Sequence, residues 1–410
     1  MGDFYDARET RDPAEREHEL MAALPAALAY AARESPHYRE ALAGHELEAV
    51  RSRDALARLP LTRKSDLAAL QKAAPPFGGL NATPASGLAR LFMSPGPIFE
   101  PEGRRPDYWR TARTLFAAGF RRGDVVLNCF SYHLTPAGSM LETGLHELGC
   151  AVIPGGVGQT ELQAQAIARL RPSGYVGTPS FLKLIVEKCD ELGLAAGSLG
   201  RALLSGEAFL PPVREALAAR RIDAYQAYGT AELGMIAYET PEREGLVVNE
   251  DLVLEIVRPG TGEPVPEGEV GEVVVTPFNA DYPLVRLATG DLSALLPGPS
   301  PCGRTNLRIR GWMGRADQAT KVRGLFVHPH QVAEVLRRHG LARGRLVVEN
   351  EAGEDRMTLH VEGEGGDTRL AGALEASVRD VMRLRGAIAW CAPGTLPNDG
   401  KVIEDARRYS

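Results

Sequence analysis

The chain has 410 residues, 44% of them hydrophobic and 24% charged, so it can bury a large core and is too long for one ordinary domain. Its formal net charge of -6 excludes a protein held to nucleic acid by general electrostatic attraction, because such binding needs clustered Lys and Arg. The five cysteines are dispersed without CxxC spacing, which predicts a reducing cytoplasm. No apolar run reaches ~18 residues, which predicts that no segment spans a membrane. The acidic N-terminus predicts no secretory signal.

The first part of the chain has a helical pattern. Residues 13–34 are rich in Ala, Leu and Glu, and residues 61–66 lead into another short helical run. We interpret residues 1–90 as a helical scaffold.

From Asp124 onward, strands alternate with helices. Strands are expected at 125–127, 151–153, 175–176, 201–204 and 223–226, with helices at 136–148 and 161–170 and others starting at 180 and 211. In the helix from Ser180, apolar residues recur at helical spacing down to Cys189, so that thiol is expected to be core packing. Repeated βα units predict a largely parallel, helix-covered sheet with its ligand site at the C-terminal ends of the strands.

Beyond Glu239 the pattern changes twice. Residues 252–257 and 272–276 are typical of antiparallel strands joined by Gly/Pro turns. Past Gly314 we expect an α+β unit with strands at 326–327, 346–348 and 357–361, helices at 331–338 and 370–384, and a final strand at 387–389. The fold class is therefore α/β: a large multi-layer region, 1–316, with a mostly parallel sheet (91–240) and a β-hairpin subdomain (241–316), followed by a small α+β domain, 317–410.

Three glycine-containing turns carry carboxylates: SGE at 205–207, YGTAE at 228–232 and TGD at 289–291. Glycine lets backbone approach a ligand closely, and a carboxylate can hold Mg²⁺ or a ribose diol. Each turn alone is usually a plain loop. Their order, followed by GRADQATKVRG at 314–324 and PNDGK at 397–401, is far more specific.

With these motifs, and with SPHYRE at 35–40, VIPGGVGQT at 152–160, TPS at 178–180 and TGEPVPEGEVGE at 261–272, the chain resembles the acyl-adenylating superfamily over nearly its whole length. Within that superfamily it resembles the phenylacetate-CoA ligase branch. The resemblance implies an AMP-forming acid–thiol ligase that activates an aromatic carboxylic acid (phenylacetate- or benzoate-like) with ATP and Mg²⁺, then passes the acyl group to coenzyme A. A homodimer fits the resemblance, and the acceptor is either coenzyme A or a carrier-protein thiol.

Two other functions remain open. One is an acyltransferase that accepts a preformed acyl-adenylate or acyl-CoA. The other is a catalytically silent protein that binds AMP or acyl-CoA.

The resemblance also implies roles for individual residues. Tyr228 is similar to the aromatic residue that stacks on adenine, a flat face suited to a nucleobase, and Asp291 to the ligand of the ribose hydroxyls. The implied nucleotide-binding set is Ser205, Gly206, Glu207, Tyr228, Gly229, Thr230, Asp291, Arg315 and Gly96.

The implied catalytic residues lie in both domains. Glu232 matches the carboxylate associated with Mg²⁺, and Asp317 matches the hinge about which a mobile C-terminal lid rotates. Lys401 corresponds to the lysine that neutralises charge developing between the carboxylate and the α-phosphate. Taken alone, Lys401 would be a solvated tail lysine, and its place in PNDGK favours the catalytic interpretation.

An acid pocket is expected after the first strand of the sheet, at Phe130, Tyr132 and His133. His133 either orients the substrate carboxylate or is an ordinary polar loop residue.

Two departures from the family pattern affect cofactors. Some relatives hold zinc with Cys and His, whereas the corresponding positions here retain only Cys302, so we predict no zinc. The stretch SPGPIFEP, 94–101, replaces a Ser/Thr/Gly-rich loop ending in Lys-Pro that cradles the β- and γ-phosphates. Proline lacks an N–H donor and Glu100 repels phosphate, so we expect weak or unusual ATP use, with Gly96 still approaching the nucleotide and Phe99 packing inward.

Overall fold

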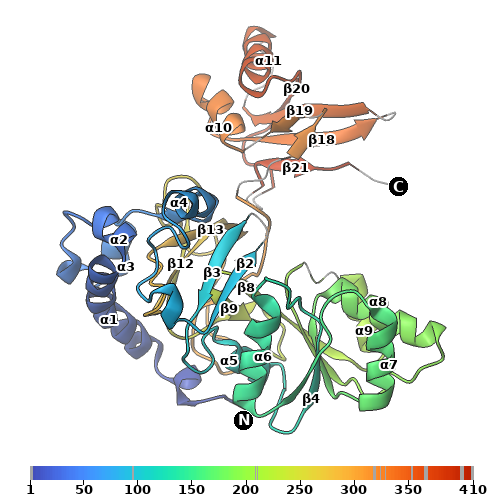
Figure 1. Cartoon of the computed structure of the whole chain (residues 1–410). Coiled ribbons are helices and arrows are strands. Elements are labelled where there is room, and N and C mark those ends of the chain that lie inside the picture. The colour runs from blue at the N-terminus through green and yellow to red at the C-terminus, as the bar shows by residue number, and fades with distance from the viewer. Residues whose placement is uncertain are drawn as a thin grey trace.

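The computed structural model describes residues 3–94, 97–207, 209, 211–316, 320–323, 325–327, 329–351, 354–363, 368–397 and 401–407 (Figure 1). Its first long helix, α1 (Pro13–Glu34), begins where Asp12 accepts hydrogen bonds from two backbone N–H groups and Pro13 occupies the first turn. The short helices α2 (Pro36–Ala41), α3 (Arg53–Ala57) and α4 (Leu67–Ala73) follow. None of the helices described is both long and apolar enough to cross a bilayer.

A nine-stranded sheet forms the centre of the large region, in the order β14-β15-β10-β9-β8-β7-β6-β4-β5. Its parallel half comprises β4 (Val125–Asn128), β5 (Ala151–Pro154), β6 (Gly174–Gly177), β7 (Arg201–Leu204) and β8 (Asp223–Thr230). The antiparallel half comprises β9 (Gly234–Tyr238), β10 (Leu246–Val248), β14 (Leu295–Leu296) and β15 (Arg308–Ile309). The α/β fold is thus confirmed, although the sheet is parallel over only about half its width.

Four helices between the parallel strands occur where the sequence predicts them: α6 (Ala137–Leu148), α7 (Thr160–Leu170), α8 (Pro179–Glu191) and α9 (Pro211–Ala219). A further helix, α5 (Thr111–Ala117), precedes β4 and was not predicted. Cys189 is fully buried on the apolar side of α8, as its spacing predicts.

A second sheet of four strands has the order β1-β13-β12-β11, formed by β1 (Thr62–Arg63), β13 (Leu287–Ser293), β12 (Gly271–Pro277) and β11 (Leu252–Val257). The TGD motif was expected in a turn at the end of a strand of the first sheet. It lies instead inside β13, because this segment continues its pairing with β12 across a register shift between Glu272 and Val274. The YGTAE motif likewise begins inside β8, which runs to Thr230 and then turns into β9.

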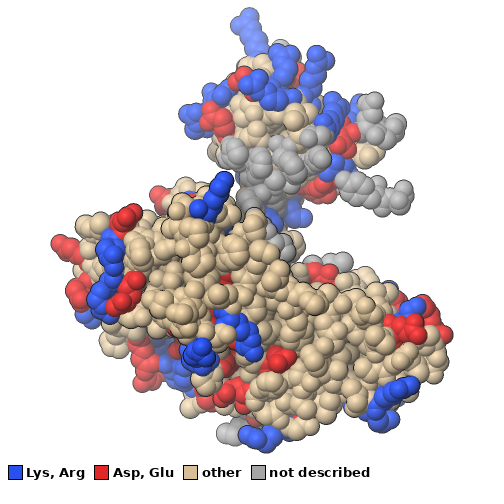
Figure 2. Space-filling view, in the orientation of Figure 1, with Lys and Arg blue, Asp and Glu red and all other residues tan. Residues whose placement is uncertain are grey.

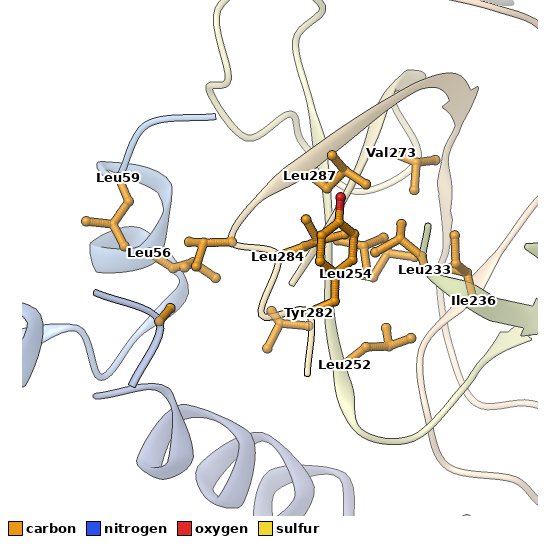
Figure 3. Close-up of a cluster of buried hydrophobic side chains, with 14 of the residues drawn as sticks. Leu56, Leu59, Leu233, Ile236, Leu252, Leu254, Val273, Tyr282, Leu284 and Leu287 are labelled. Atoms are coloured by element: carbon orange, nitrogen blue, oxygen red, sulfur yellow. The ribbon is translucent and has the colours of Figure 1, made fainter. Parts of the chain in front are cut away.

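The hydrophobic core beneath this second sheet joins it to the N-terminal helices. Figure 3 shows Tyr282 among leucines of the β-rich part, with Leu56 and Leu59 lying on the side of the N-terminal helices. A fully buried leucine stabilises the fold by about 2 kcal/mol relative to an exposed one. The contact therefore fixes the helices to this sheet.

The stretch SPGPIFEP belongs to an antiparallel hairpin, β2 (Arg90–Ser94) and β3 (Ile98–Glu102), in which Ser94 faces Ile98. Strand alternation buries Ile98 and Glu100 and turns Phe99 outward, with 38% of its surface exposed. The expectation that Phe99 packs inward is therefore wrong, because the face that buries Glu100 cannot also bury its neighbour.

The C-terminal part has a sheet of its own, in the order β20-β19-β18-β21 (Figure 1). Its elements are β18 (Gly344–Glu351), β19 (Glu354–Glu362), β20 (Ala387–Cys391), β21 (Ile403–Asp405), α10 (Pro329–Arg338) and α11 (Thr368–Met382), preceded by the hairpin β16 (Thr320–Val322) and β17 (Leu325–Val327). The strand at 387–389 is not the last, since β21 pairs in parallel with β18. Figure 2 shows Lys and Arg side chains gathered on this part, around α10 and α11.

Candidate active site

Tyr228 and Asp291 bring the two sheets of the large region together. The Tyr228 hydroxyl, from β8, donates a hydrogen bond of 3.0 Å to Asp291 Oδ2, from β13. Arg315 Nη1 lies 3.2 Å from Asp291 Oδ1 and forms an ion pair with it. Burial and then the Asp291 charge raise the pKa of Tyr228 well above its ordinary value, so the phenol stays protonated and keeps donating. The arrangement presents a carboxylate beside an aromatic ring and a guanidinium.

An exposed tryptophan completes this corner. Trp312 Nε1 donates to Asp291 Oδ1 at 3.1 Å while 53% of the residue is exposed. Sequence reasoning missed Trp312, whose indole N–H lies next to the carboxylate assigned to the ribose.

The rest of the YGTAE motif is constrained by backbone. A Cβ atom on Gly229 would lie 2.6 Å from the carbonyl oxygen of Gly234, so only glycine fits between these strands. The Thr230 hydroxyl accepts the N–H of Leu233 at 3.3 Å, closing the turn that carries Glu232.

The SGE motif lies beside the expected acid pocket. Gly206 has φ +86°, a left-handed conformation that favours glycine, and a Cβ there would lie 3.8 Å from the Phe130 ring. Ser205 N–H donates to the Gly177 carbonyl at 3.1 Å, while the exposed Glu207 accepts the Ser180 N–H at the start of α8 at 2.6 Å. Phe130 is buried next to Gly206.

The other two residues of the expected acid pocket differ from Phe130 in exposure. The Tyr132 hydroxyl donates to Glu142 at 2.6 Å and accepts from Asn128 at 2.8 Å, which holds the half-buried ring in place. His133 lies on the exposed surface of the same loop.

Glu232 is paired with a lysine from the N-terminal part of the chain. Lys64 Nζ donates to Glu232 Oε2 at 3.0 Å, and none of the Glu232 side-chain surface is exposed. Oε1 is buried as well and also lies 3.0 Å from Lys64 Nζ, so the ammonium contacts both carboxylate oxygens. Carboxylate oxygens are the ligands that a hard divalent cation prefers, and a cation bound here would have to displace Lys64 from one of them. The interpretation of residues 1–90 as scaffold alone therefore needs correction, because Lys64 enters the site directly after β1.

Glu100 lies in the same buried environment. Its carboxylate accepts the Ser94 N–H at 3.2 Å and a hydrogen bond from the Ser94 hydroxyl, and the residue is fully buried. Burial is the main cause that raises the pKa of Glu100 to about 7, and the Glu232 charge adds to it whereas Lys64 opposes it. A net negative cluster therefore forms where the sequence resemblance expects phosphate.

Lys401 is exposed and precedes β21 at the edge of the C-terminal sheet. Gly96 and Asp317, the other two expected site residues, lie outside the described residues. Sequence reasoning missed Lys64, and the signal that could have found it is a lone lysine beside a short strand, Thr62–Arg63, in an otherwise helical segment.

The chain is similar to known proteins in sequence and in structure. The model of a family described as AMP-binding enzyme matches residues 108–277. The phenylacetate-coenzyme A ligase of Thermus thermophilus is 34% identical over 354 residues, covering 82% of this chain and 78% of that protein. The enzyme of the same name from Pseudomonas putida is 30% identical over 440 residues, covering 98% of both.

A solved structure is similar over almost the full length. It is 2-hydroxyisobutyryl-CoA ligase in complex with 2-HIB-AMP and CoA in the thioesterification state, with a TM-score of 0.71, 26% identity, and coverage of 98% of this chain and 92% of that one. An open conformation of that ligase gives a TM-score of 0.72 with 26% identity over 95% of this chain and 91% of that one.

Proposed function

Because this chain belongs to the phenylacetate-CoA ligase-like branch of the AMP-binding enzymes and is an acid–CoA ligase of the AMP-forming class, we propose that its acid is aromatic. In the proposed reaction the carboxylate attacks the α-phosphate of ATP, pyrophosphate leaves, and the thiol of coenzyme A then displaces AMP from the acyl-adenylate. The relatives that are similar in sequence support an arylacetate, since they are phenylacetate-coenzyme A ligases.

The observation that carries the nucleotide-binding part of the proposal is the corner formed by Tyr228, Asp291 and Arg315. A carboxylate that already accepts hydrogen bonds at 3.0 and 3.1 Å from a phenol and an indole suits a diol such as ribose. The guanidinium beside it supplies positive charge for a neighbouring phosphate. The sheet edge where β8 ends is also where open α/β sheets bind ligands.

At the phosphate end, Glu232 would hold Mg²⁺ through one of its two carboxylate oxygens, both of which contact Lys64 in this structure. When bound, the ion supplies charge neutralisation to the phosphates. We assign to Lys401 the stabilisation of charge between the attacking carboxylate and the α-phosphate, a role supported by the family resemblance of PNDGK. Phe130, next to Gly206, supplies an apolar wall for the ring of the acid.

The test is acid-dependent exchange of pyrophosphate into ATP with Mg²⁺, measured over a panel of aryl and short aliphatic acids. We expect exchange with phenylacetate-like or benzoate-like acids, and loss of at least a hundredfold in Lys401→Ala, since preorganised charge at such positions contributes roughly that much. A matched control is Lys183→Ala, a lysine paired with Glu187 on the surface of α8. Exchange only with aliphatic acids would refute the aromatic assignment.

A further inference from the structure

Ser94, in the described part of the β2–β3 hairpin, directs its polar groups to a side chain of the hairpin itself. The N–H and hydroxyl of Ser94, the last residue of β2, both donate to the Glu100 carboxylate. A phosphate-binding loop needs such donors free to face an anion. Here both donors of Ser94 are already satisfied within the hairpin.

Glu100 is fixed in this position by the residue before it. Gln71 Nε2 donates to the Phe99 carbonyl at 2.8 Å, and the Phe99 N–H donates to Gln71 Oε1 at 2.8 Å. Gln71 itself is buried in α4. Because these two bonds hold the backbone N–H and C=O of Phe99, they fix the register of β3, which places Glu100 on the buried face of the strand.

The charged side chains at and around Glu100 include more carboxylates than ammonium groups. Lys64 is already paired with Glu232 at 3.0 Å, and both act electrostatically on Glu100. Two carboxylates therefore share one ammonium. Mg²⁺ held by Glu232 would neutralise part of the charge of extra phosphate groups, but these groups would still either face the Glu100 carboxylate or force it to take up a proton, and both cost free energy. A nucleotide that ends at one phosphate avoids that cost.

Building on the proposed function, we propose that Glu100 determines the nucleotide preference of this site: fixed beside the Glu232–Lys64 pair, it disfavours the β- and γ-phosphates of ATP and leaves binding of AMP and acyl-adenylate unaffected. The chain accordingly runs the thioester-forming half-reaction efficiently from acyl-adenylate and has a high KM for ATP in the adenylate-forming half-reaction.

The experiment measures the Kd values of AMP and of Mg²⁺–ATP by calorimetry in the full chain and in Glu100→Gln. Glutamine keeps the shape and the bond from the Ser94 hydroxyl but removes the charge. We expect the ratio of the ATP Kd to the AMP Kd to fall by about tenfold or more. This is the effect expected when one charge is removed within about 10 Å of the phosphates, at the dielectric screening typical of a protein. The KM for ATP in pyrophosphate exchange should fall similarly, with the KM for acyl-adenylate within about twofold of the parent.

Two variants control for charge and for burial. Glu100→Asp retains the charge and should keep the parental ratio. Glu102→Gln alters a buried carboxylate two residues further along β3, which bonds Trp109 and Ser139 instead, and should also keep it. AMP binding with an unchanged ratio in Glu100→Gln overturns the inference and leaves the proposed function standing. Failure of the parent chain to bind AMP overturns both.

Discussion

The buried carboxyl of Glu100 should make the stability of the fold depend on pH, and Glu100→Gln should remove that dependence. Its pKa is raised from 4.5 to about 7 in the folded chain, mainly by burial. Over this interval the native state holds a proton that the unfolded chain has released, so the contribution of Glu100 to stability is greatest below pH 4.5 and is lost as the pH rises to about 7. At 1.36 kcal/mol per pKa unit, the loss amounts to roughly 3 kcal/mol.

Urea unfolding followed by circular dichroism at pH 4.5 and pH 8 checks this prediction. Glu100→Gln should match the parent at the lower pH and be more stable by roughly 3 kcal/mol at the higher one. Glu102→Gln should be destabilised at both, because its carboxylate accepts hydrogen bonds from Trp109 and Ser139 that an amide makes less well. If Glu100→Gln is no more stable than the parent at pH 8, Glu100 carries no unfavourable buried charge and the reasoning fails.

Three further substitutions test the site and its frame. Lys64→Met leaves Glu232 as a buried unpaired charge and should lower the free energy of unfolding by about 3 kcal/mol, measured in urea. Asp291→Asn should weaken AMP binding about tenfold, read from the fluorescence of Trp312, which lies 3.1 Å from that carboxylate. Gly229→Ala forces a methyl group to within 2.6 Å of a backbone oxygen and should destabilise the chain by about 1–3 kcal/mol in thermal unfolding.

Elements with strong local patterns could be predicted from the sequence. Helix α1 and strands β7 and β11 occur at the residues predicted, because capping, apolar periodicity and β-branched runs are encoded in neighbouring residues. Motifs in the sequence also single out candidate site residues on β8 and β13. The strands that carry these residues were not predicted, since a turn signal such as TGD does not reveal that its strand continues by pairing with a distant one.

The N-terminal contribution to the site depends on such distant pairing. Strand β1 pairs in parallel with β13, placing Thr62 opposite Leu287, and no local pattern of residues specifies a partner so far along the chain. This register carries Lys64 toward the end of the sheet where Asp291 lies. Glu100 escaped prediction as a buried residue for a related reason: its burial depends on the hairpin register, which one residue of slip would reverse.

The ribose end and the phosphate end of the candidate site are each formed by a contact between the two sheets. Asp291 on β13 bonds Tyr228 on β8, and Lys64 after β1 bonds Glu232 after β8, so each contact joins the four-stranded sheet to the nine-stranded one. The ribose and phosphate ends of a nucleotide would both lie along this line between the sheets. A charge placed along this line acts electrostatically on residues of both sheets. The replacement of phosphate-loop donors by Glu100 therefore changes the electrostatics of the site. It does not change the two sheets that position the site residues.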